Sequence, residues 1–556
     1  MSVEDPPIER RHSNTGGETN GANEGDEDRL AQFGYKQELK RDWGLAHNFG
    51  VSFSIISVIT GITTLFSYGL NTGGPAVMSI GWILVSFFTL LVAIAMAEIV
   101  SAIPTSGGPY FWAAMLAPPR WSPFAAWLTG WYNLLGQVAV TTGITFGLAN
   151  LLPTAITLKH PDFEATPRIV IGIYAALLVS HAVVNTFGVR ILRHLNNFSI
   201  LLHSAGITAL CIAVLALAPT HRPASFVFGT FHDGTAAVSE DTGEPLADGW
   251  SIRASPAYVA LCGALLSQYT LTGFDASAHL SEETRNASWS APIGVVSSVG
   301  FSALFGFFVL MALLFSVQDF ERTLGSAYGQ PVLQILVDVA GENGALGLFC
   351  LILVCVWHCG LFSMTSNSRM MFAFARDGGI HPYFHMVDAR FRSPIRAVWL
   401  SATLSFCLGL PSLGSSVAFA AATSIATIGL YISYGIPVAI GLLCHRSFSA
   451  MKGPFNLGML SRPVALAACL WIGFITVVFC LPTTNPVSSQ TFNYTAVAVG
   501  ILSVFAVGSW VVWAHRWFTG PSAEVAEAMR LGVDITEPGA LEEREKAVGN
   551  KASASS

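Results

Sequence analysis

Long apolar runs recur along this chain and constrain its fold more than any other feature. They lie near 51–71, 76–100, 124–152, 168–189, 198–218, 257–280, 292–316, 344–372, 396–411, 416–443, 463–482 and 493–517. Each run has, or nearly has, the roughly 20 residues that a helix needs to cross a bilayer. Only 11% of the residues are charged, against about 25% in a soluble domain. We therefore predict an all-α integral membrane protein with about twelve transmembrane helices.

Polar segments flank this apolar region at both ends of the chain. We assign residues 1–48 to a disordered tail with a juxtamembrane segment, 49–518 to the twelve-helix domain and 519–556 to a second tail. With the N-terminus inside, the inner loops hold about twelve Lys and Arg residues and the outer loops about five, which favours cytoplasmic termini. We expect a multi-pass protein of the plasma membrane, with the vacuolar membrane as the alternative.

The apolar run near 257–280 contains a carboxylate, Asp275. Residues 260–283 read ALCGALLSQYTLTGFDASAHLSEE, and Asp275 follows Thr272, Gly273 and Phe274 where a membrane helix would continue with apolar residues. A charged group inside a span is costly and by default marks a functional site. Glycine lowers helix stability by about 1 kcal/mol relative to alanine, so the Thr-Gly pair is a natural interruption. We predict a broken helix whose gap holds a solute.

A second Thr-Gly pair lies in the first apolar run, at Thr60 and Gly61, and is followed by Ile62, Thr63 and Thr64. Gly-interrupted helices at matching positions of two halves indicate a transporter binding site. The N-terminus of the outer half-helix would attract a substrate carboxylate. The alternative is a glycine that lets another helix approach closely.

Other polar and aromatic residues are candidates for the same site. Freed carbonyls at Tyr269 and the next three residues would face a substrate ammonium. Asp275 would either contact that amine or cap the following half-helix. Asn133 and Gln137 share one helix face, where they either line the site or join helices. Trp357 lies at mid-span and is a candidate wall.

Five stretches carry a resemblance to a known family: GYKQELKR from Gly34, AEIVSAIPTSGGPYFWAA from Ala97, PFAAWLTGWYN from Pro123, LTGFDASAHLSEETRNA from Leu271 and SNSRMMFAFARDGGIHP from Ser366. They resemble the amino acid–polyamine–organocation transporters, specifically the fungal branch of GABA and choline permeases. The resemblance covers nearly all of residues 34–517. It implies a five-plus-five inverted repeat with broken helices 1 and 6, followed by two further helices. It also implies that Phe274 is a gate over the substrate.

Titratable residues in or beside the spans are candidates for proton coupling. The resemblance implies a titratable cation on the fifth helix in some relatives. His203 is the candidate there, because the helix has no Lys and histidine titrates near the working pH. The alternative is a histidine that packs between helices. Glu98 is the second candidate, and His181, His279 and His358 are further alternatives.

These features favour a secondary active transporter, an amino acid permease that imports GABA or another amino acid with protons by alternating access. Choline is the runner-up substrate, because several aromatic residues could cage a quaternary ammonium: Tyr68, Trp131, Tyr132, Tyr269, Phe274 and Trp357. A polyamine would need more acidic residues than the spans contain. A further alternative is a nutrient receptor that has kept the fold without transport.

An enzyme is the competing class, and the sequence gives it no support. The chain has no HExxH or Gly-x-Ser-x-Gly motif and no paired Asp in its helices, which are signatures of common catalytic sites. The cysteine spacing matches no usual zinc pattern. We expect no metal, no other cofactor and no nucleic-acid partner. The expected partners are the small-molecule substrate, protons and the lipid bilayer.

Overall fold

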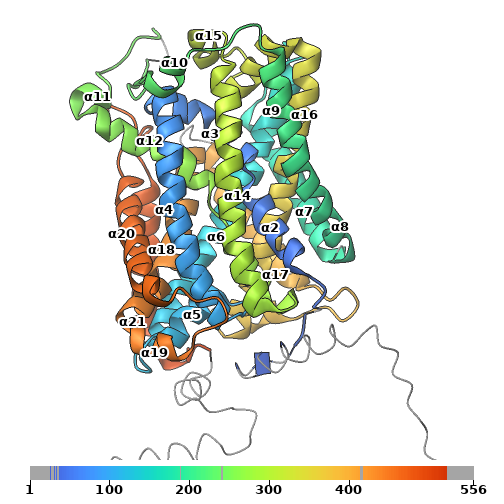
Figure 1. Cartoon of the computed structure of the whole chain (residues 1–556), viewed down its shortest axis with the longest axis vertical. Coiled ribbons are helices and arrows are strands. Elements are labelled where there is room, and N and C mark those ends of the chain that lie inside the picture. The colour runs from blue at the N-terminus through green and yellow to red at the C-terminus, as the bar shows by residue number, and fades with distance from the viewer. Residues whose placement is uncertain are drawn as a thin grey trace, which may run out of the picture.

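The computed structural model of this chain describes residues 26, 30–31, 33, 35, 37–39, 41–187, 189–239, 242–413 and 418–521. Within these residues, ten helices are long and apolar enough to cross a membrane. They run side by side in one elongated bundle (Figure 1). The predicted all-α membrane fold is therefore confirmed. Most of the two predicted tails, residues 1–25 and 522–556, lies outside the described residues.

The ten spans are built from the following helices: α2 (Leu45–Ile56) with α3 (Val58–Asn71), α4 (Gly74–Ala102), α6 (Ser122–Thr157), α7 (Pro167–Phe187), α8 (Val189–Leu201) with η1 (Leu202–Gly206) and α9 (Ile207–Leu217), α14 (Ala287–Phe315), α16 (Pro331–Arg376), α18 (Ala418–Leu443), η5 (Gly458–Leu460) with α20 (Ser461–Val478), and α21 (Thr495–Val512).

Two other predicted spans are present as shorter helices. The run near 257–280 forms α12 (Pro256–Thr270) and α13 (Ala276–His279), and the run near 396–411 forms α17 (Ile395–Gly409). The total of twelve crossings stays a prediction, because these helices are shorter than the other ten. An 18-residue helix is about 27 Å long, close to the thickness of the hydrocarbon core.

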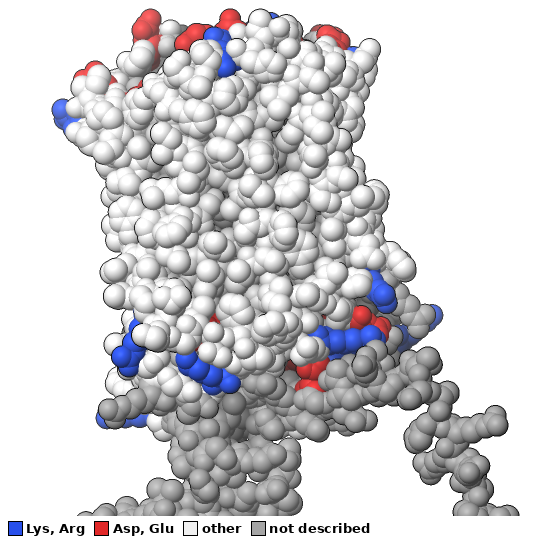
Figure 2. All heavy atoms as spheres, in the orientation of Figure 1, with Lys and Arg blue, Asp and Glu red and all other residues white. Residues whose placement is uncertain are grey.

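The charged side chains separate by position along the bundle. On the face shown in Figure 2, Lys, Arg, Asp and Glu gather at the upper and lower ends, and the belt between them is white. This belt includes exposed apolar side chains of α4, among them Ile80, Ile83, Leu84 and Phe87. An apolar surface of this extent suits lipid rather than water.

Short helices close the two ends of the bundle. The upper end in Figure 1 carries α10 (Ala224–Gly229), α11 (Trp250–Arg253) and α15 (Phe320–Leu324), and the lower end carries α5 (Pro109–Leu116) and α19 (His445–Ala450). Two 3₁₀ turns, η2 (Ser281–Glu283) and η3 (Pro382–His385), belong to the connections after α13 and α16. Helix α6 is central, since it packs against α5, α7, α16, α17, α18 and α21.

The first span is interrupted at Ser57, not at the predicted Thr60–Gly61 pair. Ser57 has φ 28° and ψ 76°, which separates α2 from α3. Its carbonyl then accepts the N–H groups of Thr60 and Gly61, at 2.8 and 3.3 Å. The Thr-Gly pair therefore belongs to the first turn of α3. The predicted position was wrong by three residues, because a serine took the unfavourable backbone conformation.

The run near 257–280 is divided between two helices. Helix α12 ends at Thr270 and α13 begins at Ala276. Gly273 between them has φ +96°, a conformation that side chains with a Cβ rarely adopt. Thr272 stays attached to the helix end, because its hydroxyl donates to the carbonyl of Gln268 at 2.7 Å.

Candidate functional site

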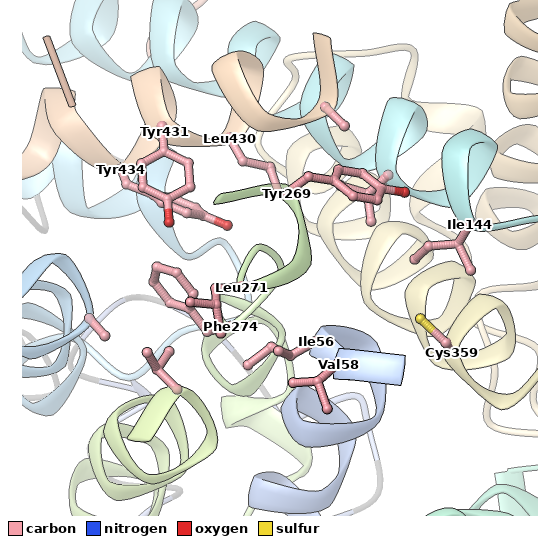
Figure 3. Packing of buried hydrophobic residues seen from close by; sticks show 14 of the residues in the cluster. Ile56, Val58, Ile144, Tyr269, Leu271, Phe274, Cys359, Leu430, Tyr431 and Tyr434 are labelled. Atoms are coloured by element: carbon pink, nitrogen blue, oxygen red, sulfur yellow. The ribbon is translucent and has the colours of Figure 1, made fainter. Parts of the chain in front are cut away.

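Both interruptions contribute to one cavity, which we call the site cavity. It is lined by Ile55, Ile56, Thr60, Gly61, Val140, Ile144, Tyr269, Thr270, Thr272 and Cys359. Figure 3 shows Ile56, Ile144, Tyr269 and Cys359 around this region, on four different helices. The cavity measures about 10 Å³, which is room for about one water molecule. A larger solute therefore needs these helices to move apart.

Two helix ends of opposite polarity meet at the site cavity. The N-terminus of α3 brings Thr60 and Gly61 to it, and the C-terminus of α12 brings Tyr269 and Thr270. The N–H groups of Thr60 and Gly61 donate to the Ser57 carbonyl, and the Tyr269 carbonyl accepts the N–H of Thr272, so in this conformation the two helix ends act on a solute through their dipoles. They carry about half a positive and half a negative charge, respectively. This pair of ends complements a solute that has both a carboxylate and an ammonium group.

The Asp275 carboxylate is fully buried and joins α13 to α6. Its Oδ2 accepts hydrogen bonds from Gln137 Nε2 at 2.8 Å and Asn133 Nδ2 at 3.4 Å, and lies 3.2 Å from His279 Nε2. Asp275 precedes the first residue of α13, but its side chain makes no capping hydrogen bond. The N–H of Ser277 donates to a serine hydroxyl of α2 instead. Of the two alternatives for Asp275, the capping role is therefore wrong.

Phe274 lies beneath two tyrosines of α18 (Figure 3). Its ring centre is 5.2 Å from that of Tyr434 and 6.3 Å from that of Tyr431. All three rings are fully buried. The Tyr434 hydroxyl and Asp275 Oδ1 have no hydrogen-bond partner among the described residues. An aromatic group with an unpaired carboxylate oxygen beside it is a suitable environment for an amine.

Four further candidates do not line the cavity in this conformation, and the buried hydroxyl of Thr63 has no hydrogen-bond partner among the described residues. Ile62 and Thr63 are buried on α3 without lining the cavity. Thr64 donates its hydroxyl to the carbonyl of Thr60 at 2.8 Å. Trp357 lies outside the cavity, where its Nε1 donates to Ser180 Oγ at 3.2 Å. Of the predicted residues, Thr60, Gly61, Tyr269 and Thr272 line the cavity directly.

The aromatic residues that suggested a choline cage do not converge on the site cavity. The Tyr68 hydroxyl donates to a main-chain carbonyl of α12 at 2.9 Å. Tyr132 pairs with a serine hydroxyl of α21, and Trp131 packs on aromatic rings of α16 and α21. Tyr269 is the member of that set that lines the cavity. The aromatic group around Phe274 includes Tyr431 and Tyr434 instead.

His203 lies against the first interruption. Its Nε2 is 2.8 Å from Ser57 Oγ and its Nδ1 is 2.9 Å from the carbonyl oxygen of Ser199. The imidazole is nearly inaccessible, with 2% exposure. This contact links the fifth predicted span to the residue at which the first span bends. It places His203 where a change in its charge would act on that bend.

Glu98 lies at the lower end of α4, away from both interruptions. Its carboxylate accepts the hydroxyl of Ser461 at 2.6 Å and the N–H of Leu457 at 3.0 Å, and lies 3.6 Å from Lys452 Nζ. Lys452 and Leu457 lie in the connection that leads into α20, and Ser461 is the first residue of α20. The contacts are those of a carboxylate that fixes a loop.

Two ion pairs join the 3₁₀ turn η2, which follows α13, to the lower end of α16. Glu282 contacts Arg376 at 3.1 Å and accepts the hydroxyl and N–H of Ser106 at 2.6 and 3.1 Å. Burial alone would raise the pKa of the Glu282 carboxyl, but Arg376 and Ser106 outweigh burial, so the pKa is lowered. Glu283 pairs with Arg369 at 2.8 Å. We call these two pairs the lower ion pairs.

Asp377 extends the same region toward the N-terminal segment. Its carboxylate accepts the hydroxyls of Tyr35 and Tyr110 at 2.8 and 2.9 Å. Burial raises the pKa of Asp377, although Arg376 and both hydroxyls favour its ionised form. The guanidinium of Arg376 lies 3.8 Å from the ring centre of Tyr35. The described part of the predicted juxtamembrane segment therefore packs against the protein itself.

Sequence reasoning missed Cys359, Val140 and Ile144 in the cavity wall. It named His279 as an alternative for proton coupling but did not predict its contact with Asp275. The α6 residues had a usable signal. Positions 133, 137, 140 and 144 follow the spacing of one helix face, which would have extended the face of Asn133 and Gln137 toward the cavity.

A comparison with known families adds to this geometry. The family model for amino acid permeases matches residues 48–504, a range that includes both interruptions. The chain belongs to the amino acid permease family. The permease is 43% identical over 509 residues to an "Amino-acid permease BAT1 homolog" of Oryza sativa subsp. japonica, covering 89% of this chain and 95% of that protein.

Two further relatives show the range of this similarity. The permease is 41% identical over 513 residues to "Amino-acid permease BAT1" of Arabidopsis thaliana, covering 89% of this chain and 96% of the relative. It is 31% identical over 519 residues to the "GABA-specific permease" of Saccharomyces cerevisiae, covering 91% of this chain and 88% of the relative. These matches agree with the superfamily that the sequence motifs indicated, and they are transporters rather than enzymes.

Proposed function

We propose that this permease imports a small zwitterionic amino acid, with GABA as the first candidate, together with protons by alternating access. The observation that carries the proposal is the meeting of the α3 N-terminus and the α12 C-terminus at one cavity. Those two ends suit a carboxylate and an ammonium group. The yeast relative named as GABA-specific supports GABA as the first substrate to test.

The proposed binding mode assigns the carboxylate to the start of α3, near Thr60 and Gly61. The ammonium group faces the carbonyls at the end of α12, near Tyr269 and Thr272. Asp275 and Phe274 join the site when the interruption opens. A flexible solute such as GABA has its two charges farther apart than an α-amino acid has. Competition between GABA and α-amino acids therefore shows which distance between carboxylate and ammonium group the site accepts.

Choline is the second candidate, because Phe274, Tyr431 and Tyr434 surround the region next to Asp275. Aromatic faces bind quaternary ammonium groups. Choline has no carboxylate, however, and would leave the α3 end without a charged partner. The polyamine alternative has less support, because none of the residues that line the site cavity is acidic.

We further propose that the lower end in Figure 1 faces the cytoplasm of a cell whose plasma membrane holds the permease. The connections at that end carry Arg120, Arg390, Arg392 and Lys452. An excess of basic residues favours the cytoplasmic side. The same orientation puts the lower ion pairs on the side where an imported solute would leave.

The test is uptake of labelled GABA, choline and neutral α-amino acids by permease-deficient yeast that expresses this chain, with each unlabelled solute as a competitor. We expect saturable GABA or amino acid uptake that increases as the external pH falls. Choline uptake that GABA does not inhibit would favour the second candidate. Binding of a solute without any uptake would favour the receptor alternative and overturn the proposal.

A further inference from the structure

Asp275, directly before α13, and His279, the last residue of α13, form a fully buried pair. His279 Nε2 lies 3.2 Å from Asp275 Oδ2, and neither side chain has any exposed surface. An unpaired charge in such a place costs several kcal/mol. The number of protons on this pair therefore matters to the stability of the interruption directly before it.

The contacts of His279 fix which nitrogen carries its hydrogen. Nδ1 lies 2.8 Å from the carbonyl oxygen of Ser106. A carbonyl only accepts hydrogen bonds, so Nδ1 must donate. Nε2 is then the nitrogen that faces Asp275. If neither Nε2 nor the carboxylate carried a proton, a nitrogen lone pair would face an anion. One proton between them turns the same contact into a hydrogen bond.

The groups around the pair do not supply that proton. From α6, Gln137 and Asn133 offer amide donors to the same Oδ2. From α18, Tyr431 and Tyr434 are the titratable side chains that face Asp275. These four residues are neutral in their ordinary forms. They lower the cost of a buried carboxylate, while the shared proton neutralises the pair as a whole.

The nearest charged groups on the lower side are already paired with each other. Ser106 separates His279 from Glu282, whose carboxylate binds Arg376. Glu283 is likewise paired with Arg369. Arg376 and Arg369 therefore already have carboxylate partners of their own. A proton is the remaining positive charge that can pair Asp275 with His279.

We propose that the Asp275–His279 pair binds the transported proton. This inference rests on the proposed function, namely proton-driven uptake. The pair takes one proton from the outer solution when the interruption after α12 is open to that side. It releases the same proton to the inner solution when α13 separates from the turn that holds Ser106.

A continuous chain of contacts connects the pair to the lower end. His279 binds the carbonyl of Ser106, the hydroxyl of Ser106 binds Glu282, and Glu282 binds Arg376. Opening the lower end around α13 separates these partners. When the pair is protonated, His279 makes a favourable contact through each ring nitrogen, with the Ser106 carbonyl and with Asp275. Proton binding therefore stabilises the closed lower end, and closure of the lower end in turn favours proton binding. Such a reciprocal effect is what coupling requires.

The hydrogen bonds of His203 differ from those of His279, and this difference indicates which histidine belongs to the proton site. A neutral His203 satisfies both its contacts, because Nδ1 donates to the carbonyl of Ser199 and Nε2 accepts the hydroxyl of Ser57. Its hydrogen bonds need no additional proton. The Asp275–His279 contact does need one, which favours that pair as the proton site.

A glycine turn holds His279 against Ser106. Gly108 has φ +57°, and a methyl group at this position would lie 2.8 Å from His279 Cε1. The PTSGG turn thus leaves just enough room for the imidazole. Replacing Gly108 with alanine crowds the ring and also strains the backbone at φ +57°, while both titratable residues are kept.

The test compares net uptake against external pH with substrate counterflow in vesicles that have no proton gradient. We expect His279→Gln to lose acid-stimulated net uptake by at least about tenfold while it keeps counterflow. Asp275→Asn should lose the acid stimulation as well. His194→Gln is the control, because His194 is an exposed histidine of α8, and its pH profile should match that of the unmodified protein.

The outcomes separate this inference from the proposed function. Absence of uptake by the unmodified protein, or uptake independent of pH, overturns proton-driven transport itself. An unchanged pH profile in His279→Gln overturns only the proton site, and loss of acid stimulation in His203→Gln alone transfers the role to His203. If His279→Gln does not reach the membrane, Gly108→Ala replaces it, and normal acid stimulation in that variant contradicts the proposal.

Discussion

Gly61 of α3 passes so close to Thr270 of α12 that a methyl group on Gly61 would lie 2.8 Å from the Thr270 Cα. Backbone atoms cannot move aside as the end of a side chain can. The two helices that meet at the site cavity are therefore held together where Gly61 lacks a side chain. This explains why a glycine in the first turn of α3 matters although the interruption itself lies at Ser57.

The first prediction concerns this contact. Gly61→Ala should reduce transport by about tenfold or more, because overpacking of this kind costs about 1–3 kcal/mol and alters the spacing of the cavity walls. Gly300→Ala is the matched control, since a methyl group there meets nothing within 4 Å and should leave uptake unchanged. Both variants are compared by initial uptake rate at equal surface expression. Normal uptake by Gly61→Ala would contradict the assigned cavity.

The second prediction uses Cys359, which lines the cavity and donates its thiol to the carbonyl of Ile55 at 3.1 Å. A small thiol reagent should inactivate transport, and an excess of substrate should slow the inactivation, because both occupy the same space. Cys359→Ser keeps a donor at this position and should transport while resisting the reagent. Cys407→Ser, a change at an exposed cysteine of α17, should stay sensitive. Inactivation of Cys359→Ser at the normal rate would place the reactive thiol elsewhere.

The sequence predicted the parts of this structure that depend on local composition. Apolar runs of span length predicted the membrane fold, and the low helix propensity of glycine drew attention to Gly273, which lies between α12 and α13 at φ +96°. The first interruption was misplaced because Ser57, at φ 28°, takes a conformation that no residue preference indicates. Residue preferences locate a helix interruption only when the residue with the unusual backbone conformation is one, such as glycine, that adopts it readily.

The side-chain partners could not be predicted in the same way. Asp275 is bound by Gln137 and His279, and the choice between these partners and a cap depends on how α6 packs against α13. Trp357 has a mid-span position, yet it turns toward Ser180 on α7. Positions along a helix follow from the sequence, whereas the face that meets a neighbour follows from the tertiary arrangement.

The third prediction concerns orientation. A cysteine introduced at exposed Glu244, in the connection between α10 and α11, should react with a membrane-impermeant maleimide on intact cells. A cysteine at exposed Arg390, between η3 and α17, should react only after the cells are made permeable. The unmodified protein provides the background from its nine cysteines. The opposite labelling pattern would invert the proposed orientation.

The fourth prediction concerns Glu282 and Arg376. Glu282→Gln should destabilise the protein by roughly 3 kcal/mol, because it removes the nearer carboxylate partner of a buried guanidinium and leaves Asp377, whose Oδ1 lies 3.7 Å from Arg376 Nε. Glu342→Gln is the control: Glu342 pairs with Lys159 at 3.2 Å but is 61% exposed, and such pairs contribute about 1 kcal/mol at most. The measurement is thermal unfolding of both variants in detergent.

The same pair predicts a pH dependence whose sign follows from the lowered pKa of Glu282. The unfolded chain binds a proton near the ordinary value of 4.5, whereas the folded protein keeps the carboxylate ionised to lower pH. The stabilisation is therefore complete above that value and is lost as the pH falls through the folded-state pKa. The unmodified protein loses this contribution of Glu282 to its stability as the pH falls, whereas Glu282→Gln never has it. The unfolding temperatures of the two proteins should therefore approach each other at low pH. A difference between the two that stays constant from neutral to strongly acidic pH would show that the pair with Arg376 does not set the ionisation of Glu282.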